Sequence, residues 1–393
     1  MTSPRVVCVT RRFWPLVGGA ETVMARLAAA FNERGAKATI LTARWRRDWP
    51  EEIEHRGVRV VRLANPAVRF WGTYRYTRAM GNWLARHRQE FDIVYVSMLK
   101  HDAYAAVGAG REHGFPVALR AEGAGLSGDC HWHLRATAGA RIKRRTLRAG
   151  AFVAPSAAIE RELVAAGYAR DRIHFIPNGV PLPPPVDAAR KAEARAALAE
   201  HSRALTVEAD APAALFTGRL DQAKGLGELV LAWREVIERH PRARLWLVGD
   251  GDYRERLAEM IESLGLRGGV VLAGAFDEVD DFLAAADLFV FPSHEEGMSM
   301  ALLEAMAAGL PIVASDIPGN RSLIENGRHG RLVPKQSHAA LATAMLELID
   351  DRAKGAELGA AARRRVINEF SIDRAVEAHL RLFADLLDRG GVR

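Results

Sequence analysis

The sequence of 393 residues predicts an α/β protein with two domains, each built on a parallel β-sheet. Two observations predict this class. Short apolar segments alternate with amphipathic ones along most of the chain, which is typical of parallel sheets that carry helices on both faces. The chain is also too long for one hydrophobic core of ordinary size, so two domains of about 180 residues each are expected.

The first domain is expected over residues 1–180 and the second over residues 181–371. The run P-L-P-P-P-V-D after Val180 marks the boundary. Proline lacks a backbone N–H and restricts φ, which excludes a regular helix or a central strand there. Residues 372–387 are amphipathic and predict a last helix within about 372–393.

The alternation of apolar and amphipathic segments places the elements in order along the chain. In the first domain, strands are expected at residues 6–10, 38–41, 58–61, 93–96, 117–120, 152–155 and 173–180, and a first helix at 21–34. In the second domain, strands are expected at 214–217, 244–248, 270–272, 288–291 and 312–314, and helices at 187–201, 226–238 and 253–264.

The composition is that of an ordinary globular protein, with 49% hydrophobic and 26% charged residues. The two cysteines, Cys8 and Cys130, exclude a disulfide framework and a cysteine-rich metal site. No apolar run reaches the length of a membrane span, and Arg5 precedes a short strand instead of a signal-peptide core. We therefore expect a cytoplasmic protein.

Positive charge is concentrated in the first half of the chain. Residues 1–180 contain 29 Lys and Arg against 15 Asp and Glu, whereas residues 181–393 contain 26 against 33. A basic domain attracts anionic substrates or an anionic membrane surface, and the alternative is a set of solvated arginines. We expect no nucleic-acid partner.

A basic stretch at residues 135–148, which we expect to be helical, adds to this pattern, and the same domain contains Trp14, Phe70, Trp71 and Trp132. Basic and aromatic side chains suit the headgroup region of a membrane. One interpretation is that this domain contacts the inner face of a membrane peripherally. The other is that the basic helix is only exposed to solvent.

The most informative segment is F-V-F-P-S-H-E-E-G-M-S-M-A-L-L-E-A-M-A-A-G-L-P at residues 289–311. It predicts a strand that ends at Pro292, a polar loop, and a helix from about Ser299 to Gly309. The N–H groups at the start of such a helix form an anion site, and Ser299 is suited to cap it.

Two carboxylates flank the start of this helix, with Glu296 on the loop and Glu304 on the helix. Carboxylates accept hydrogen bonds from hydroxyl pairs, so the arrangement suggests a ligand with sugars at both ends and phosphate between them, as in a nucleotide sugar. The alternative is that both glutamates are solvated.

Glycines and cations follow two other predicted strands. Gly18 and Gly19 precede the first helix, where glycine lets a ligand approach the backbone. Arg219 and Lys224 lie in one loop after a strand of the second domain, in the sequence G-R-L-D-Q-A-K-G. Ligands of open α/β sheets gather at the carboxyl ends of strands, so these cations are placed to meet a diphosphate.

The segment E-G-M-S-M-A-L-L-E resembles the signature of the retaining glycosyltransferases of family 4, in which seven residues separate two glutamates. The likeness continues through D-I-P-G-N to N-G-R-H-G-R-L-V-P. It implies the GT-B fold, with two Rossmann-like domains facing across a cleft and a last helix that crosses back to the first domain. It also implies metal-independent transfer from a nucleotide sugar in the C-terminal domain to an acceptor in the N-terminal domain.

The resemblance also implies a role for each matching residue. Arg219 and Lys224 would hold the donor pyrophosphate and neutralise the leaving group. Glu296 would orient the donor sugar, and Glu304 would hold the ribose diol. The other donor-binding positions are Gly18, Gly19, Ala275, Phe276, Gly297, Met298, Ser299, Met300, Ala301 and Gly319.

The sequence departs from the family pattern at two places. Glu122 stands where most relatives carry a histidine near the acceptor, and it is either an acceptor-side group or a loop carboxylate without a role. Met298 and Ser299 occupy positions where many members have Phe and Gly, which leaves the donor sugar undefined.

Asp250 and Asp252 resemble the Asp-x-Asp motif of metal-dependent glycosyltransferases, but the strand, G-D-G turn and helix around them fit a structural turn. We therefore expect no metal site and no cofactor, only a UDP- or GDP-linked sugar as co-substrate. Two alternatives stay open: a UDP-sugar 2-epimerase of the same architecture, and a non-catalytic partner subunit.

Overall fold

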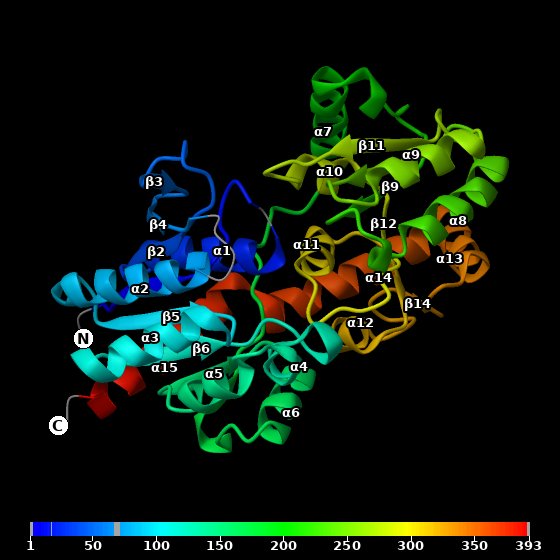
Figure 1. The fold of residues 1–393 in the computed structure, drawn as a ribbon. Coiled ribbons are helices and arrows are strands. Elements are labelled where there is room, and N and C mark those ends of the chain that lie inside the picture. The colour runs from blue at the N-terminus through cyan, green and yellow to red at the C-terminus, as the bar shows by residue number, and fades with distance from the viewer. Residues whose placement is uncertain (1–2, 17, 67–70, 391–393) are drawn as a thin grey trace. The chain divides into compact units, whose positions relative to one another are not determined.

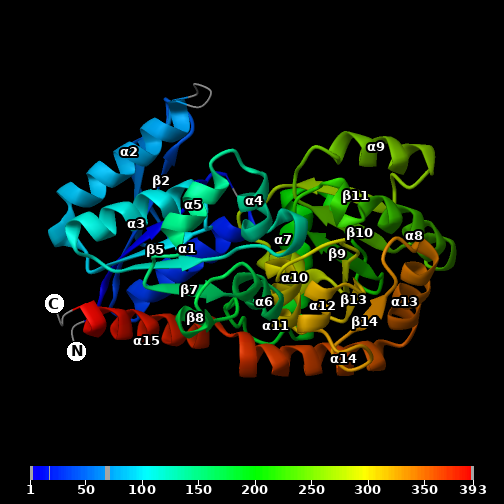
Figure 2. The same ribbon diagram turned by 60° about the horizontal axis from the view of Figure 1, so that its bottom comes forward.

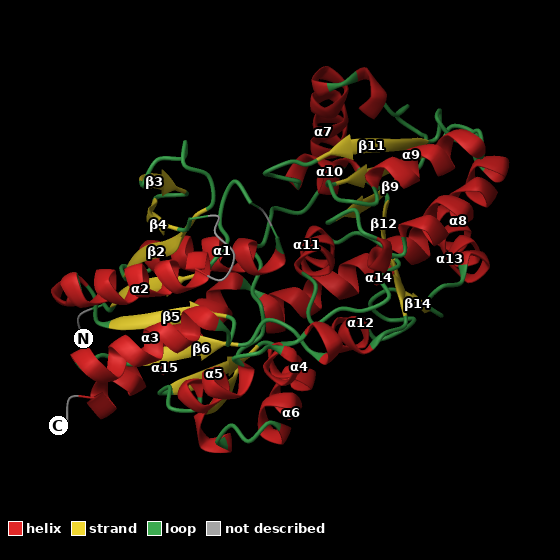
Figure 3. Ribbon diagram, viewed as in Figure 1, coloured by secondary structure: helices red, strands yellow, loops and turns green. Residues whose placement is uncertain are grey.

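The computed structural model describes residues 3–16, 18–66 and 71–390 and divides into two compact units (Figure 1). One unit comprises Met1–Gly179 with Ile372–Arg393, and the other comprises Val180–Ser371. Each unit contains one predominantly parallel sheet with helices packed around it (Figure 3). The predicted class, two α/β domains with parallel sheets, is confirmed.

The first unit has an eight-stranded sheet in the order β3-β4-β2-β1-β5-β6-β7-β8. All described pairs are parallel except β3 with β4. The strands are β1 (Arg5–Val9), β2 (Lys37–Arg44), β3 (Glu52–His55), β4 (Val58–Ala64), β5 (Ile93–Ser97), β6 (Val117–Arg120), β7 (Ala151–Ala154) and β8 (Ile173–Phe175). The central strands are buried, as continuous apolar runs predict for a sheet covered on both faces.

The helices of this unit are α1 (Gly19–Glu33), α2 (Trp71–Arg86), α3 (His101–His113), α4 (Asp129–Arg135), α5 (Gly139–Thr146), α6 (Ala157–Ala165) and α15 (Ile372–Gly390). On one face, α3 contacts both α2 and α5; on the other, α1 contacts α15 (Figure 2). Alternate residues of each strand supply the two cores, since successive strand side chains point to opposite faces.

The last helix is fixed to the first unit by buried contacts. The ring of Phe383 lies 5.6 Å from that of Phe31 in α1 and 5.5 Å from that of Tyr95 in β5. The hydroxyl of Tyr95 lies 2.8 Å from Nε2 of His379, and burial lowers the pKa of His379 to about 3. A neutral imidazole therefore completes this core.

The second unit has a six-stranded sheet in the order β11-β10-β9-β12-β13-β14, with all pairs parallel. The strands are β9 (Ala213–Thr217), β10 (Arg244–Val248), β11 (Val270–Gly274), β12 (Leu288–Phe291), β13 (Ile312–Ser315) and β14 (Arg331–Val333). The strand order reverses beside β9 and β12, and in open α/β sheets such a reversal is where ligands bind.

The helices of the second unit are α7 (Ala188–His201), α8 (Leu226–Arg239), α9 (Arg254–Ser263), α10 (Asp280–Ala285), α11 (Met300–Ala308), α12 (Pro318–Leu323), α13 (His338–Asp350) and α14 (Arg352–Arg365). In one group, α8 contacts both α9 and α13. In the other, α10 contacts α7 and α11, and α11 contacts α14. Trp233 of α8 and Trp246 of β10 are completely buried in this core.

The basic stretch at residues 135–148 is not one helix, which corrects the expectation from sequence. Helix α4 ends at Arg135, and α5 begins at Gly139. A Cβ at Gly139 would lie 2.0 Å from the carbonyl oxygen of His133, so the chain turns back closely here. The guanidinium carbon of Arg145 lies 3.7 Å from the ring centroid of Tyr104, so part of the basic charge packs against the domain.

Of the aromatic residues considered for membrane contact, Trp71 is 63% exposed, and Phe70 lies outside the described residues. None of the helices in the described ranges has the length and hydropathy that crossing a bilayer requires.

Candidate active site

The loop and helix after β12 have the predicted form. Ser299 is the N-cap of α11, and its side chain accepts a 3.3 Å hydrogen bond from the N–H of Leu302. Gly309 ends the helix in the left-handed conformation, with φ of 77°. Most of α11 is buried, and Ala301 and Glu304 lie along its partly exposed stripe. Ala301 and Glu304 are therefore partly accessible, whereas Ser299 and Met300 at the start of the helix are buried.

The structure joins two of the predicted catalytic side chains directly. Nζ of Lys224 lies 2.5 Å from Oε1 of Glu296, and both side chains are mostly buried. The same ammonium group lies 5.8 Å from the ring centroid of Phe291 in β12. A cation and a carboxylate thus meet at one point, in the loops that follow β9 and β12.

The Lys224–Glu296 pair forms because the loop after β9 closely approaches the loop after β12. Gly225 has φ of 67°, and a Cβ on it would lie 2.2 Å from the carbonyl oxygen of Pro292. The N–H of His294 donates a 2.8 Å hydrogen bond to the carbonyl of Ala223. Nε2 of His294 also lies 3.1 Å from Oε1 of Glu228 in α8. Sequence analysis missed His294 and Glu228, because their link depends on the two loops meeting.

Arg219 lies exposed on the loop after β9, and no described side chain pairs with its guanidinium. Its backbone is held firmly. The N–H of Leu220 donates a 3.0 Å hydrogen bond to the carbonyl of Asp250, and a Cβ on Gly249 would lie 1.8 Å from the carbonyl oxygen of Gly218. The loop therefore presents one free cation from a rigid base.

These contacts also assign a structural role to the G-D-G turn. Asp250 accepts through its carbonyl from Leu220, and its side chain accepts a 2.9 Å hydrogen bond from the N–H of Gly251. Within the described residues, no three His, Cys, Asp or Glu side chains gather as a group that could hold a metal ion. The turn braces the Arg219 loop.

Several of the positions predicted to bind the donor lie close to the Lys224–Glu296 pair. A Cβ on Gly319 would lie 2.3 Å from the carbonyl oxygen of Glu296, so glycine here admits the Glu296 loop. Gly297 and Met298 continue the loop and are partly buried.

The loop after β11 contains Ala275 and Phe276. Ala275 is exposed, whereas the ring of Phe276 lies 4.8 Å from that of Phe282 and 5.1 Å from that of His201. Phe276 therefore packs against α10 and α7, and Ala275 is the more accessible of the two.

In the first unit, Gly18 caps α1 in an extended conformation, and Gly19 begins the helix. Among the described residues, no atom would lie within 4 Å of a Cβ on Gly19, so the start of α1 is open on that side in the described part of the chain. An open helix start is compatible with the expected anion contact.

Glu122 is held in a buried network at the carboxyl ends of β5 and β6. Its Oε1 accepts hydrogen bonds from Ser97 at 2.7 Å and from Nε of Arg120 at 2.9 Å. Burial raises the pKa of Glu122, and the bonds from Arg120 and Ser97 oppose that shift. Arg120 also donates to Asn178, which lies after β8. These contacts give Glu122 a structural role.

The sequence contained one signal for this network. Arg120 ends the apolar strand V-A-L-R, and a charged residue in a buried strand needs a partner. The network could not be predicted in full, because Ser97 ends β5 and Asn178 lies in the loop after β8.

A second buried acid, Asp102, lies near the start of α3. Oδ1 of Asp102 is 3.7 Å from Nη1 of Arg11, and Oδ2 accepts a 3.4 Å hydrogen bond from Tyr76. Burial raises the pKa of Asp102 to about 6, against the opposing effect of Arg11.

This shift predicts a dependence of stability on pH. The ordinary aspartate pKa is about 3.9, so between about pH 4 and pH 6 the folded state holds more protons than the unfolded state. The contribution of Asp102 to the free energy of unfolding should therefore decline as pH rises through this window, and Asp102→Asn should remove that contribution. Urea midpoints at about pH 4.5 and pH 7 measure it. If Asp102→Asn and the exposed control Asp171→Asn change the decline equally, the prediction is wrong.

Comparison with known proteins decides the family. Residues 211–351 match the family model described as "Glycosyl transferases group 1", and residues 18–179 match "Glycosyl transferase 4-like domain". The two matches include every predicted site residue. The chain belongs to the GT-B glycosyltransferases of the family-4 type.

Among relatives of this glycosyltransferase is the lipopolysaccharide core biosynthesis glycosyltransferase LpsD of Rhizobium meliloti, 29% identical over 95% of this chain and 96% of LpsD. Two other curated relatives align over only 52% and 54% of their own length, so this chain spans about half of each.

Solved structures share the fold of this glycosyltransferase. Sucrose-phosphate synthase from Thermosynechococcus elongatus superimposes with a TM-score of 0.81, at 22% identity over 98% of this chain and 100% of the other. HepE of Anabaena, solved in complex with UDP-glucose, has a TM-score of 0.75 at 19% identity, over 98% and 100% of the two chains.

Proposed function

We propose that this glycosyltransferase moves a hexose from a UDP- or GDP-linked donor to a sugar, lipid-linked or small-molecule acceptor in polysaccharide or lipopolysaccharide-type synthesis. The anomeric configuration would be retained, and no metal would take part. The observation that carries the proposal is the pair formed by Lys224 and Glu296 beside the start of α11. The names of LpsD and of the HepE complex with UDP-glucose support it.

The chemistry follows from where charge develops. As the bond between the anomeric carbon and the phosphate oxygen breaks, negative charge accumulates on the diphosphate. Arg219, Lys224 and the N–H groups around Met300 and Ala301 are held in place before that charge appears. Preorganised donors of this kind are commonly the largest contribution to catalysis.

Recognition of the donor would use the two acids. Glu296, with the backbone of Gly297, Met298 and Ser299, would orient the hydroxyls of the donor sugar. Glu304, on the open stripe of α11, would accept hydrogen bonds from the ribose diol. Both roles rest on charged acceptors, which bind hydroxyl groups more strongly than neutral acceptors do.

A panel of nucleotide sugars tests the proposal. A ligand that binds only the folded protein raises its melting temperature, so UDP-, GDP- and ADP-sugars are compared by thermal shift. We expect one nucleotide class to stabilise the protein and the purified protein to hydrolyse that donor slowly. A panel in which no nucleotide sugar changes the melting temperature contradicts the proposal.

Glu304→Gln is expected to raise the donor KM by about tenfold with little change in kcat, because a charged hydrogen bond to the ribose contributes about 1.5–3 kcal/mol. Initial rates of donor turnover against donor concentration measure it. Glu357→Gln, an exposed change in α14 of the same unit, is the control. An unchanged KM for Glu304→Gln would remove Glu304 from the donor site.

Two alternatives give different results in the same assays. A UDP-sugar 2-epimerase would form the epimer of the donor without any acceptor. A non-catalytic partner would turn over no donor, and the presence of Arg219, Lys224, Glu296 and Glu304 argues against it.

We propose a cytoplasmic location with peripheral contact at the inner face of the membrane, through the basic first domain. Arg135, Arg141, Arg144 and Arg148 are exposed there. Co-sedimentation with anionic vesicles, and its loss at high salt, tests this contact.

A further inference from the structure

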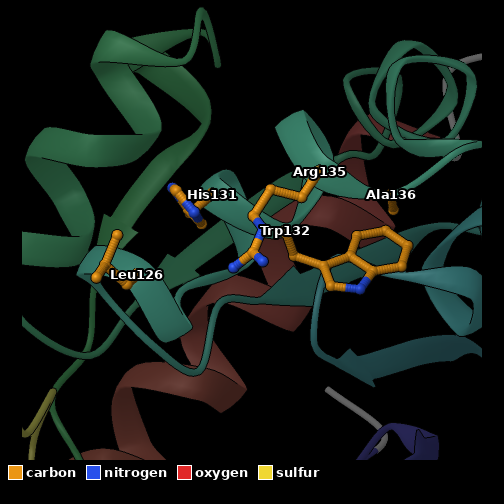
Figure 4. Close-up of a pocket in the computed structure, with 5 residues that line it drawn as sticks. All are labelled: Leu126, His131, Trp132, Arg135 and Ala136. Carbon is orange, nitrogen blue, oxygen red and sulfur yellow. The ribbon is translucent and has the colours of Figure 1, made fainter.

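A pocket of about 460 Å³ lies in the first unit, and none of its lining residues is among those assigned above to the donor or to catalysis. Its lining residues are Leu126, His131, Trp132, Arg135 and Ala136 (Figure 4). Four of them belong to α4 or follow it directly, and Leu126 lies in the short 3₁₀ turn before α4. The volume is within the range of about 300–1,000 Å³ that is usual for small-molecule sites.

The helix that forms this pocket is anchored to the carboxyl ends of two central strands. Asp129, at the start of α4, accepts hydrogen bonds from the N–H of Leu99 at 3.2 Å and of Glu122 at 2.9 Å. Nε2 of His133 lies 2.7 Å from the carbonyl oxygen of Leu99. Leu99 follows β5 and Glu122 follows β6, so α4 stands on the edge of the sheet where ligands of such folds gather.

The charged groups of the lining are basic only. Arg135 is exposed, and no described carboxylate pairs with it; His131 lies across the pocket from the indole of Trp132, with Arg135 between them in the view of Figure 4. The nearby acids are already engaged: Asp129 by two N–H groups, and Glu162 by the N–H of Gly125 at 2.6 Å. The lining therefore favours a ligand with negative charge.

Trp132 adds a flat apolar ring to the pocket, and two histidine rings pack against it. Its ring lies 5.2 Å from that of His101 and 5.6 Å from that of His133, with edge contacts in both cases. Nζ of Lys100 lies 5.8 Å from the indole centroid, which adds positive charge near the ring. An aromatic face beside a few cationic donors suits the C–H face of a pyranose together with an acidic substituent.

We propose that this pocket binds an acidic pyranose unit of the acceptor, that is, a sugar that bears a carboxylate or a phosphate. Trp132 stacks on the sugar ring, and Arg135 pairs with the acidic group, with His131 as a second donor. This inference rests on the proposed function and extends it by naming the class of acceptor. A carboxylate or phosphate matches the planar fork of donors on Arg135.

The test is calorimetric titration of the full chain with three probes: methyl β-D-glucuronide, glucose 6-phosphate and the uncharged methyl β-D-glucoside. We expect both acidic probes to bind more tightly than the glucoside. Arg135→Gln should weaken binding of the acidic probes by about tenfold or more and leave the glucoside unchanged. Arg144→Gln removes the same charge from an exposed position of α5 outside the pocket and should have no effect.

Trp132 is tested with two variants, because its ring also packs against His101 and His133. Trp132→Ala should abolish binding of all three probes, and Trp132→Phe should retain part of it. If Trp132→Ala does not fold, Arg135→Gln still decides the outcome, since Arg135 is exposed and without a partner side chain in the described chain. Equal affinity for acidic and uncharged probes would overturn the proposal, as would equal effects of Arg135→Gln and Arg144→Gln.

Vesicles of phosphatidylcholine with phosphatidylglycerol distinguish a sugar site from a lipid headgroup site. Binding to vesicles that depends on Arg135, without binding of either acidic sugar, overturns the proposal. Failure of the proposed function would appear separately, as a lack of thermal stabilisation by any nucleotide sugar. Donor stabilisation without binding of acidic sugar refutes this pocket alone.

Discussion

Lys224→Ala is expected to lower kcat for donor turnover by about 100- to 1,000-fold, the usual effect of removing one preorganised donor from a developing oxyanion. Two causes add. The leaving diphosphate loses a cation, and Glu296 loses the group that lies 2.5 Å from its carboxylate. A free, mostly buried carboxylate would then face the phosphate and oppose its charge. Rates at saturating donor measure the change.

The matched control for this change is Lys335→Ala. Lys335 is an exposed lysine of the same unit, and no described side chain forms an ion pair with it. It should leave kcat within about twofold, since exposed charges away from a site have small effects. A kcat for Lys224→Ala within about threefold of the unsubstituted enzyme would show that Lys224 does not stabilise the leaving group.

Arg120→Met should be the most destabilising of the single substitutions considered, at about 3–5 kcal/mol, the usual cost of removing one partner of a buried ion pair. The Arg120 side chain is 1% exposed and pairs with Glu122 at 2.9 Å. Without it, the carboxylate of Glu122 and the amide oxygen of Asn178 each lose a hydrogen-bond donor, and the charge of Glu122 is left without its cation. The urea midpoint and the hydrogen exchange of residues 93–129 measure the loss.

Replacing the unpaired carboxylate of Glu122 by a neutral amide should recover part of the stability that Arg120→Met loses. Arg120→Met with Glu122→Gln removes the uncompensated acid while keeping an oxygen that can accept from Ser97, so the double variant should be more stable than Arg120→Met alone. Arg59→Met breaks a surface pair with Glu52, in which both side chains are about half exposed, and should cost less than about 1 kcal/mol. If Arg120→Met and Arg59→Met shift the midpoint equally, Arg120 does not hold a buried network.

The segment from β12 to α11 shows which structural features neighbouring residues are enough to predict. The predicted strand at residues 288–291, the Ser299 cap and the Gly309 end all occur in the structure. Each depends on neighbours in the chain: an apolar run, a hydroxyl three residues before the N–H it caps, and a glycine that can adopt positive φ. Such signals can be seen without knowledge of the fold.

The stretch at residues 135–148 shows where that reasoning fails. A basic helical stretch was expected there, and the structure has the shorter helix α5, with a close turn that separates it from the end of α4 at Arg135. Gly139 lies against the carbonyl of His133 where the chain turns between the two helices, and Arg145 of α5 packs against Tyr104. Charge patterning alone does not reveal which arginines pack against an aromatic ring.

The sequence by itself determined the α/β class, the order of the elements and the identity of the residues that carry charge to the carboxyl ends of the strands. Only the tertiary structure decided which of those residues meet: Lys224 with Glu296, Arg120 with Glu122, and Trp132 with Arg135 around one pocket. The physical reason is the separation along the chain over which each interaction acts. Helix periodicity and capping act over a few neighbouring residues, whereas these contacts exist because parallel strands bring together loops that are distant in the chain.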